Sequence, residues 1–123
     1  MSGRNFLIDT NVVIGVLDGR DAAKDLLRIA GATPDACAVS QITRIEVLSH
    51  HAVTEESNME IQRLLSKFHV ILLDEQIEEA TIALRRRARL KLPDAIIAAT
   101  AHVQGLTLLT LDERLRAAWQ SVR

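Results

Sequence analysis

Residues 6–13 have the sequence FLIDTNVV, in which a short apolar run, Phe6-Leu7-Ile8, ends in the acid Asp9 and is followed by the first valines of a helical pattern. Three more runs are apolar along most of their length rather than alternating; they span residues 36–39, 70–73 and 106–109. Runs of this kind are typical of strands that are buried on both faces of a parallel sheet. We therefore expect four short strands, of which residues 6–8 form the first.

Apolar residues at helical spacing fill the segments between these runs. The predicted helices span residues 12–17, 26–29, 42–52, 57–67, 75–89 and 93–104, with Gly31 and Gly105 at the ends of the second and the sixth. Strands that alternate with helices predict an α/β fold with right-handed crossovers. We expect three α/β/α layers, with a central parallel sheet of four to five strands, in a single domain that covers residues 1–123.

The composition is that of an ordinary globular protein. Of the 123 residues, 48% are apolar and 25% are charged, and 15 Lys and Arg oppose 16 Asp and Glu; these values exclude a disordered chain and a coiled-coil rod. No apolar run approaches the roughly 20 residues that span a bilayer, and no secretory h-region follows the N-terminus, so we expect a cytoplasmic protein without a membrane partner. The single cysteine, Cys37, excludes an internal disulfide framework and a thiolate zinc cage.

Four carboxylates are placed to meet at one edge of the predicted sheet. Asp9 directly follows the first strand, and Asp112 comes shortly after the fourth. The other two, Glu46 and Asp94, lie near the N-terminal ends of helices, and helices that connect parallel strands begin at the carboxyl edge of the sheet. Ligands of open parallel sheets bind at that edge. The sequence therefore predicts one acidic site there.

A divalent cation is the expected centre of this acidic site. Asp94 begins a helix that is apolar or small around its whole circumference, and Glu46 lies beside the apolar arc of its own helix, so both side chains are expected to face inward. Four carboxylates without a counter-charge repel one another by several kcal/mol. Lys91 is the only basic residue that the sequence places in the neighbouring loops. An all-oxygen donor set selects Mg²⁺ or Mn²⁺, which activates water for phosphodiester hydrolysis.

Four blocks of sequence resemble the PIN-domain ribonucleases, in particular the VapC toxins of bacterial and archaeal toxin–antitoxin pairs. The blocks are residues 6–13, 42–48, 92–101 and 105–112, in the order and with about the spacing of that family. The resemblance implies a PIN-like nuclease domain, a Mg²⁺- or Mn²⁺-dependent endoribonuclease, and the role of toxin in a type II module. It also implies an RNA substrate, a cognate antitoxin whose C-terminal segment covers the active groove, and a homodimer.

The same resemblance assigns roles to residues of the site. It places Asp9 and Asp94 nearest the metal, with Glu46 and Asp112 completing the acidic set. Four polar residues resemble those that surround the acids in the family: Thr10, Asn11, Thr43 and Thr110.

The chain departs from the family's pattern in two places. Leu115 stands where many relatives carry Phe. An unusually basic stretch, Arg85-Arg86-Arg87 with Arg89 and Lys91, precedes the block that contains Asp94. For Arg86, Arg89 and Lys91 one hypothesis is contact with RNA phosphates, and the alternative is a solvated helix face balanced by Glu78 and Glu79.

Each acid also has a structural interpretation. Asp9 and Asp112 are suited to cap the helices that follow them. Asp94 is suited to complement the dipole of its helix, and Glu46 to pair with a neighbour such as Arg44.

Other functions would use a similar set of acids. A phosphoreceiver-like signalling module also binds Mg²⁺ at this edge, and Asp74 is the candidate phosphorylation site, but no fifth strand with a following Lys is evident. A phosphatase with Asp9 as nucleophile would need a second Asp where Asn11 stands. A third alternative is a chain that acts by binding, as half of a complex that represses its own transcription.

Overall fold

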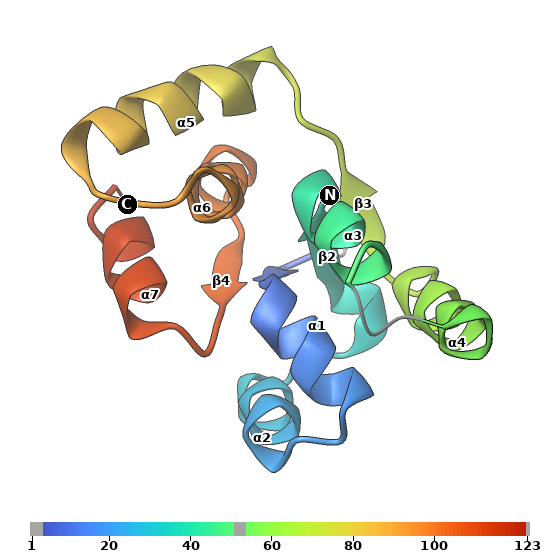
Figure 1. Cartoon of the computed structure of the whole chain (residues 1–123). Coiled ribbons are helices and arrows are strands. Elements are labelled where there is room, and N and C mark those ends of the chain that lie inside the picture. Colours follow the sequence, from blue (N-terminus) through green and yellow to red (C-terminus); the bar gives the residue numbers. More distant parts are fainter. Residues whose placement is uncertain (1–3, 51–53, 123) are drawn as a thin grey trace.

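The computed structural model describes residues 4–50 and 54–122, and this part of the chain alternates between strands and helices (Figure 1). In chain order the elements are β1 (Phe6–Ile8), α1 (Thr10–Leu17), α2 (Asp21–Ala30), β2 (Cys37–Ser40), α3 (Gln41–Leu48), α4 (Glu55–Leu65), β3 (His69–Ile71), α5 (Glu75–Arg87), α6 (Leu92–Gln104), β4 (Thr107–Leu109) and α7 (Glu113–Gln120). No helix in the described ranges is long and apolar enough to cross a membrane.

The described strands form one parallel sheet of four in the order β3-β2-β1-β4. β1 is therefore an inner strand: Leu7 is paired with Ala38 of β2 on one side and with Leu108 of β4 on the other. The described sheet thus has four strands, the lower of the two numbers expected from the sequence. The carboxyl end of β1 lies at the middle of the sheet edge, and this position buries whatever side chain follows the strand.

The two faces of the sheet are covered by different helices, which confirms the three-layer α/β/α arrangement (Figure 1). Leu7 packs with residues of α5, α6 and α7, whereas the next residue, Ile8, packs with residues of α1, α2, α3 and α4. Both side chains are almost fully buried. Successive residues of a strand point to opposite faces, so a sheet with helices on both sides requires the continuous apolar runs that the sequence contains.

Several element boundaries differ from the expected ones. A single 3₁₀ turn at Pro34–Ala36 delays β2 to Cys37, and β3 spans His69–Ile71 rather than 70–73. α3 ends at Leu48 instead of continuing to 52; Ala52 lies outside the described residues. α5 ends at Arg87 instead of 89 because Ala88 has an extended backbone. Periodicity locates elements well but their ends poorly, because local hydrogen bonds set the last turn.

Close packing of α1 against α2 depends on Gly15. A Cβ atom built on Gly15 would lie 2.6 Å from the Cβ of Ala23, which is fully buried in α2. Such a distance forces the two helices apart. A larger residue at position 15 therefore displaces α1 from α2, and the first turn of α1 contributes residues to the acidic site.

The substitution Gly15→Ala is expected to lower the free energy of unfolding by about 2 kcal/mol, because overpacking outweighs the gain in helix propensity. Urea denaturation measures the change. Adding Ala23→Gly removes the opposing Cβ and should restore part of the loss. If Gly15→Ala alone stabilises the protein, the claim that α1 and α2 pack too closely for a Cβ at position 15 is wrong.

Candidate active site

Asp9 lies at the carboxyl end of β1 and is only 4% exposed. Its Oδ1 accepts a hydrogen bond of 2.8 Å from the backbone amide of Thr10, and its Oδ2 accepts one of 2.6 Å from the hydroxyl of Thr110. The residue is thus the N-cap of α1, as the structural interpretation predicted. Both of these donors are neutral, so the capping role leaves the negative charge of the carboxylate uncompensated.

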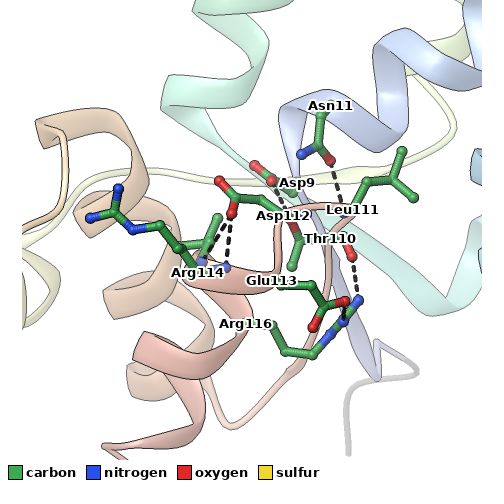
Figure 2. Close-up of polar contacts among 9 residues, drawn as sticks. Asp9, Asn11, Thr110, Leu111, Asp112, Glu113, Arg114 and Arg116 are labelled. Carbon is green, nitrogen blue, oxygen red and sulfur yellow. Dashed lines mark hydrogen bonds and ion pairs between the residues drawn. The ribbon is translucent and has the colours of Figure 1, made fainter.

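The turn at residues 110–112 brings Asp112 to the same edge of the sheet. Three hydrogen bonds fix this turn (Figure 2). The Thr110 hydroxyl accepts a 3.0 Å hydrogen bond from the Asp112 amide while it donates to Asp9. Asn11 Oδ1 accepts from the Leu111 amide at 3.2 Å. The guanidinium of Arg116 donates to the carbonyl of Thr110 at 2.5 Å. These contacts tie the end of β4 to the start of α1.

Asp112 is itself the N-cap of α7. Its Oδ1 accepts hydrogen bonds from the amides of Arg114 (2.9 Å) and Leu115 (3.3 Å). Its Oδ2 has no hydrogen-bond partner among residues 4–50 and 54–122. One oxygen therefore serves the helix, and the other remains available to a ligand.

Glu46 is oriented by two threonines. The Thr10 hydroxyl lies 2.7 Å from Glu46 Oε1 and 3.0 Å from the Thr43 hydroxyl. A hydroxyl has one proton, and a carboxylate can only accept, so Thr10 donates to Glu46 and Thr43 donates to Thr10. No ion pair with Arg44 is found in the part of the chain that the structure describes. The expected placement of Thr10 and Thr43 beside the acids is therefore seen in these contacts.

Asp94 lies half-buried in the first turn of α6, directly after Pro93. It lines a cavity of about 180 Å³ together with Asp112 and the basic residues Arg89, Lys91 and Arg114. Burial raises the pKa of Asp94, and the neighbouring Asp112 raises it further, while Lys91 and Arg114 oppose the rise. Asp94 therefore shares this cavity with one acid and three bases, of which Lys91 and Arg114 act on its pKa.

The pKa of Asp9 is raised from 3.8 to about 6, chiefly because the carboxylate is removed from water. Hydrogen bonds from Thr110 and Thr10 lower the pKa, and the charges of Asp94 and Glu46 raise it. Asp9 thus feels the charges of Asp94 and Glu46, and Asp94 feels that of Asp112. The structure brings all four predicted acids into one electrostatic neighbourhood.

Arg114 is a residue of the site that sequence reasoning missed. Its guanidinium donates to the carbonyl of Arg89 at 3.0 Å and lowers the pKa of Asp94. The expectation that only Lys91 is basic near the acids was therefore wrong. A signal was present: once Asp112 caps α7, Arg114 falls in the first turn of that helix, next to the acid.

The donor set fits a hard divalent cation that keeps part of its water. No three Asp, Glu, His or Cys side chains within residues 4–50 and 54–122 are close enough to hold one ion together. Mg²⁺ commonly binds only one or two carboxylates directly and retains several waters. The buried carboxylate of Asp9, with neutral hydrogen-bond donors and acids around it, suits this mode of binding. The other carboxylates would then be reached through water.

Three comparisons relate this chain to known proteins. The family model described as PIN domain matches residues 6–119. Ribonuclease VapC10 of Mycobacterium tuberculosis is 34% identical over 111 residues, which cover 86% of this chain and 81% of the relative.

Solved structures show the same fold. A toxin–antitoxin complex from Klebsiella pneumoniae contains a chain with a TM-score of 0.78 and 38% identity, with 88% of this chain and 87% of that chain covered. FitAcB from Neisseria gonorrhoeae has a TM-score of 0.76 at 22% identity, with 94% and 93% covered. At that identity the second likeness concerns the fold alone.

Replacing Asp9 by Asn should change how stability depends on pH in EDTA. The raised pKa means that the folded wild-type protein keeps a proton between pH 3.8 and about 6 that the unfolded chain has released, so its unfolding free energy falls as pH rises through this range. Asp9→Asn lacks this loss. The unfolding free energy of the variant minus that of the wild type should therefore increase by about 2 kcal/mol from pH 4 to pH 7.5.

Urea denaturation at both pH values measures this difference. Asp25→Asn on the exposed surface of α2 controls for the loss of one negative charge. A difference between wild type and Asp9→Asn that does not change with pH would contradict the buried, charged carboxylate.

The variant Thr110→Val should cost about 1–3 kcal/mol of unfolding free energy, because it leaves Asp9 Oδ2 without a donor and the Asp112 amide without an acceptor. Thr100→Val is the matched control: Thr100 is equally buried, but its hydroxyl bonds only to Ile96 O of its own helix. Urea denaturation of both variants compares them. Equal losses would show that the Thr110 hydroxyl has no special role in holding the acids.

Proposed function

The chain belongs to the PIN domain family and is a relative of the VapC ribonucleases, and from this premise we propose that it is a Mg²⁺- or Mn²⁺-dependent endoribonuclease that acts as the toxin of a type II toxin–antitoxin module. One observation carries the proposal most: Asp9 is buried with neutral hydrogen-bond donors only, next to the charges of Asp94 and Glu46. Such an arrangement is costly without a cation.

The metal would be held by Asp9 and Asp94, with Glu46 and Asp112 acting through water. The all-oxygen character of the set favours Mg²⁺ or Mn²⁺ over softer ions. When bound, such an ion lowers the pKa of a water ligand and neutralises charge that develops on a phosphodiester. No nucleophile from the protein is required for this hydrolysis.

The protein's own residues orient the acids and receive the substrate. Thr110 holds one oxygen of Asp9, and Thr10 holds one oxygen of Glu46, so that the remaining lone pairs are directed by fixed hydrogen bonds. Lys91 and Arg114 line the cavity beside Asp94 and can bind the phosphate whose ester bond is cleaved. Asn11 fixes the turn that carries Asp112.

The proposal also names partners and assembly. We assign the activity to one PIN-like nuclease domain at residues 1–123, silenced by a cognate antitoxin; relatives of this fold occur in toxin–antitoxin complexes. A homodimer is proposed as well, and Ile45, Leu72 and Leu73 are large apolar side chains exposed by 48–63% that such an interface would cover. Light scattering of the purified chain measures its oligomeric state.

The phosphoreceiver alternative is disfavoured by the position of Asp74. This residue caps α5 after the edge strand β3, and β2 lies between β3 and β1, the strand that Asp9 follows. No fifth strand is present in residues 4–50 or 54–122. The geometry therefore lacks the acid cluster that phosphorylation at Asp74 would require. The phosphatase alternative is likewise disfavoured, because the Asn11 side chain is engaged with the turn.

Asp94→Asn should abolish cleavage of RNA in MnCl₂, with a loss of at least about 100-fold, while the protein stays folded, because the amide cannot supply the charge that binds the cation. Cleavage of total RNA, followed by sequencing of the new ends, measures activity and target together. His102→Gln, an exposed change on the same helix, is the control.

Thermal unfolding gives a readout that does not depend on activity. MnCl₂ should raise the Tm of the wild-type protein but not that of Asp94→Asn, because a ligand stabilises only the state that binds it. A fully active Asp94→Asn protein would overturn the proposed mechanism.

A further inference from the structure

A basic groove leads away from the acidic site along the end of α5. It is a hollow of about 810 Å³ whose lining includes Arg85, Arg86, Arg89 and Lys91, with the apolar side chains of Ile82 and Leu92 beside them. All six of these residues are exposed; Ile82 is 46% and Leu92 51% exposed. The groove therefore joins four positive charges to a partly apolar surface.

The positive charges of the groove are not compensated by their own helix. The residues one turn before Arg85 and Arg86 are Thr81 and Ile82, so neither arginine has an acid at the spacing where helical ion pairs form. Glu78 lies about two turns before Arg85, too far along α5 to act as its partner. Glu78 and Glu79 therefore do not form helical ion pairs with Arg85 or Arg86, and the interpretation of a solvated helix face remains the alternative.

The four positive side chains of the groove form no hydrogen bond or ion pair in the part of the chain that the structure describes, and Lys91 acts on Asp94 only through its charge. The third arginine of the run behaves differently. Arg87 donates a hydrogen bond to the Ser121 carbonyl and lines a separate hollow between α5 and α6. Of the three consecutive arginines, Arg87 therefore has a hydrogen-bond partner, whereas Arg85 and Arg86 can bind a ligand in the groove.

The basic groove adjoins the acidic cavity. Arg89, Leu90 and Lys91 line both hollows, and Arg114 lines only the smaller one. Lys91 caps α6, and Asp94 follows in the first turn of that helix. A chain that lies in the groove and continues past Lys91 therefore arrives at Asp94 and Asp112.

We propose that the basic groove binds the sugar–phosphate backbone of a single RNA strand on one side of the bond that is cleaved. The inference rests on the proposed nuclease function and assigns the substrate contacts of that same site. Charge complementarity favours a polyanion, and adjacency to the cavity that receives the cleaved phosphodiester favours the substrate itself over a separate acidic protein. The acidic cavity, at about 180 Å³, can admit a single phosphate group.

Binding in this groove is electrostatic rather than aromatic. Only 2% of the residues are aromatic, and the large side chains next to the arginines are the aliphatic Ile82 and Leu92. Base stacking, which dominates many single-strand binders, is therefore nearly absent here. Affinity should accordingly follow salt concentration, with a slope of about −0.7 per phosphate contacted on a single strand.

The test is a salt titration of binding in EDTA, where the bound RNA stays intact. The probe is a 15-nucleotide oligouridylate with a 5′ fluorescein, and fluorescence anisotropy is followed from 50 to 300 mM KCl. The double variant Arg85→Gln/Arg86→Gln should make the slope of log K against log salt shallower by about 1.4, and should weaken binding at 0.1 M salt on the order of 20-fold.

A matched control separates the groove from the overall charge of the protein. Lys24→Gln/Arg63→Gln removes two exposed positive charges from α2 and α4, neither of which lines the groove. It should leave the slope within a few tenths of the wild-type value. Equal slope changes in both double variants would overturn the assignment of a specific groove.

Cleavage kinetics in MnCl₂ distinguish this inference from the proposed function. Arg85→Gln/Arg86→Gln should raise KM for RNA with little change in kcat, because these two arginines line the groove but not the cavity in which the bond is cleaved. If wild type cleaves RNA and the variant matches it in slope and KM, the groove assignment fails while the nuclease stands. Wild-type protein that cleaves no RNA would instead contradict the function. Unchanged RNA binding combined with lost inhibition by the cognate antitoxin would overturn the RNA assignment and give the groove to an acidic protein segment.

Discussion

The burial of one carboxylate at the end of an inner strand is the constraint on which the acidic site depends. β1 has a neighbouring strand on each side, so Asp9, which follows β1, lies at the middle of the sheet edge. There α1 and the turn after β4 cover its side chain. The loss of water raises its pKa to about 6. Its hydrogen bond to the Thr10 amide caps α1, but removing its charge from water costs free energy, and a bound cation would offset that cost.

Neutral donors, not arginines, hold the acids in place. Thr10, Thr43 and Thr110 form hydrogen bonds that fix Glu46 and Asp9 without neutralising them. An arginine in the same position would orient a carboxylate equally well but would occupy the place of a metal ion. The three bases of the cavity line it beside Asp94, whereas the charges that act on Asp9 are those of Asp94 and Glu46. The hydroxyl network therefore preserves the negative potential that a cation requires.

Positive and negative charge are separated along the same surface. The acids gather at the carboxyl edge of the sheet, and the free arginines follow α5 away from that edge. The near-neutral net charge of −1 conceals this division. Under the proposed function, the basic groove would attract a polyanionic chain along its length, and the reacting phosphate would lie at the acids and at the cation that they would hold.

Much of the fold and the identity of the acids follow from the sequence alone. Continuous apolar runs require strands covered on both faces, and an acid at the end of such a run must lie at the sheet edge; β1 was located to the residue on this basis. The strand order and the helix ends did not follow, because they depend on hydrogen bonds and packing between distant segments. Only the tertiary structure placed Arg114 beside Asp94 and turned Arg87 away from Arg85 and Arg86. The physical reason is that residue type and spacing determine which face or edge a side chain occupies, whereas its partner across that surface is supplied by another part of the chain.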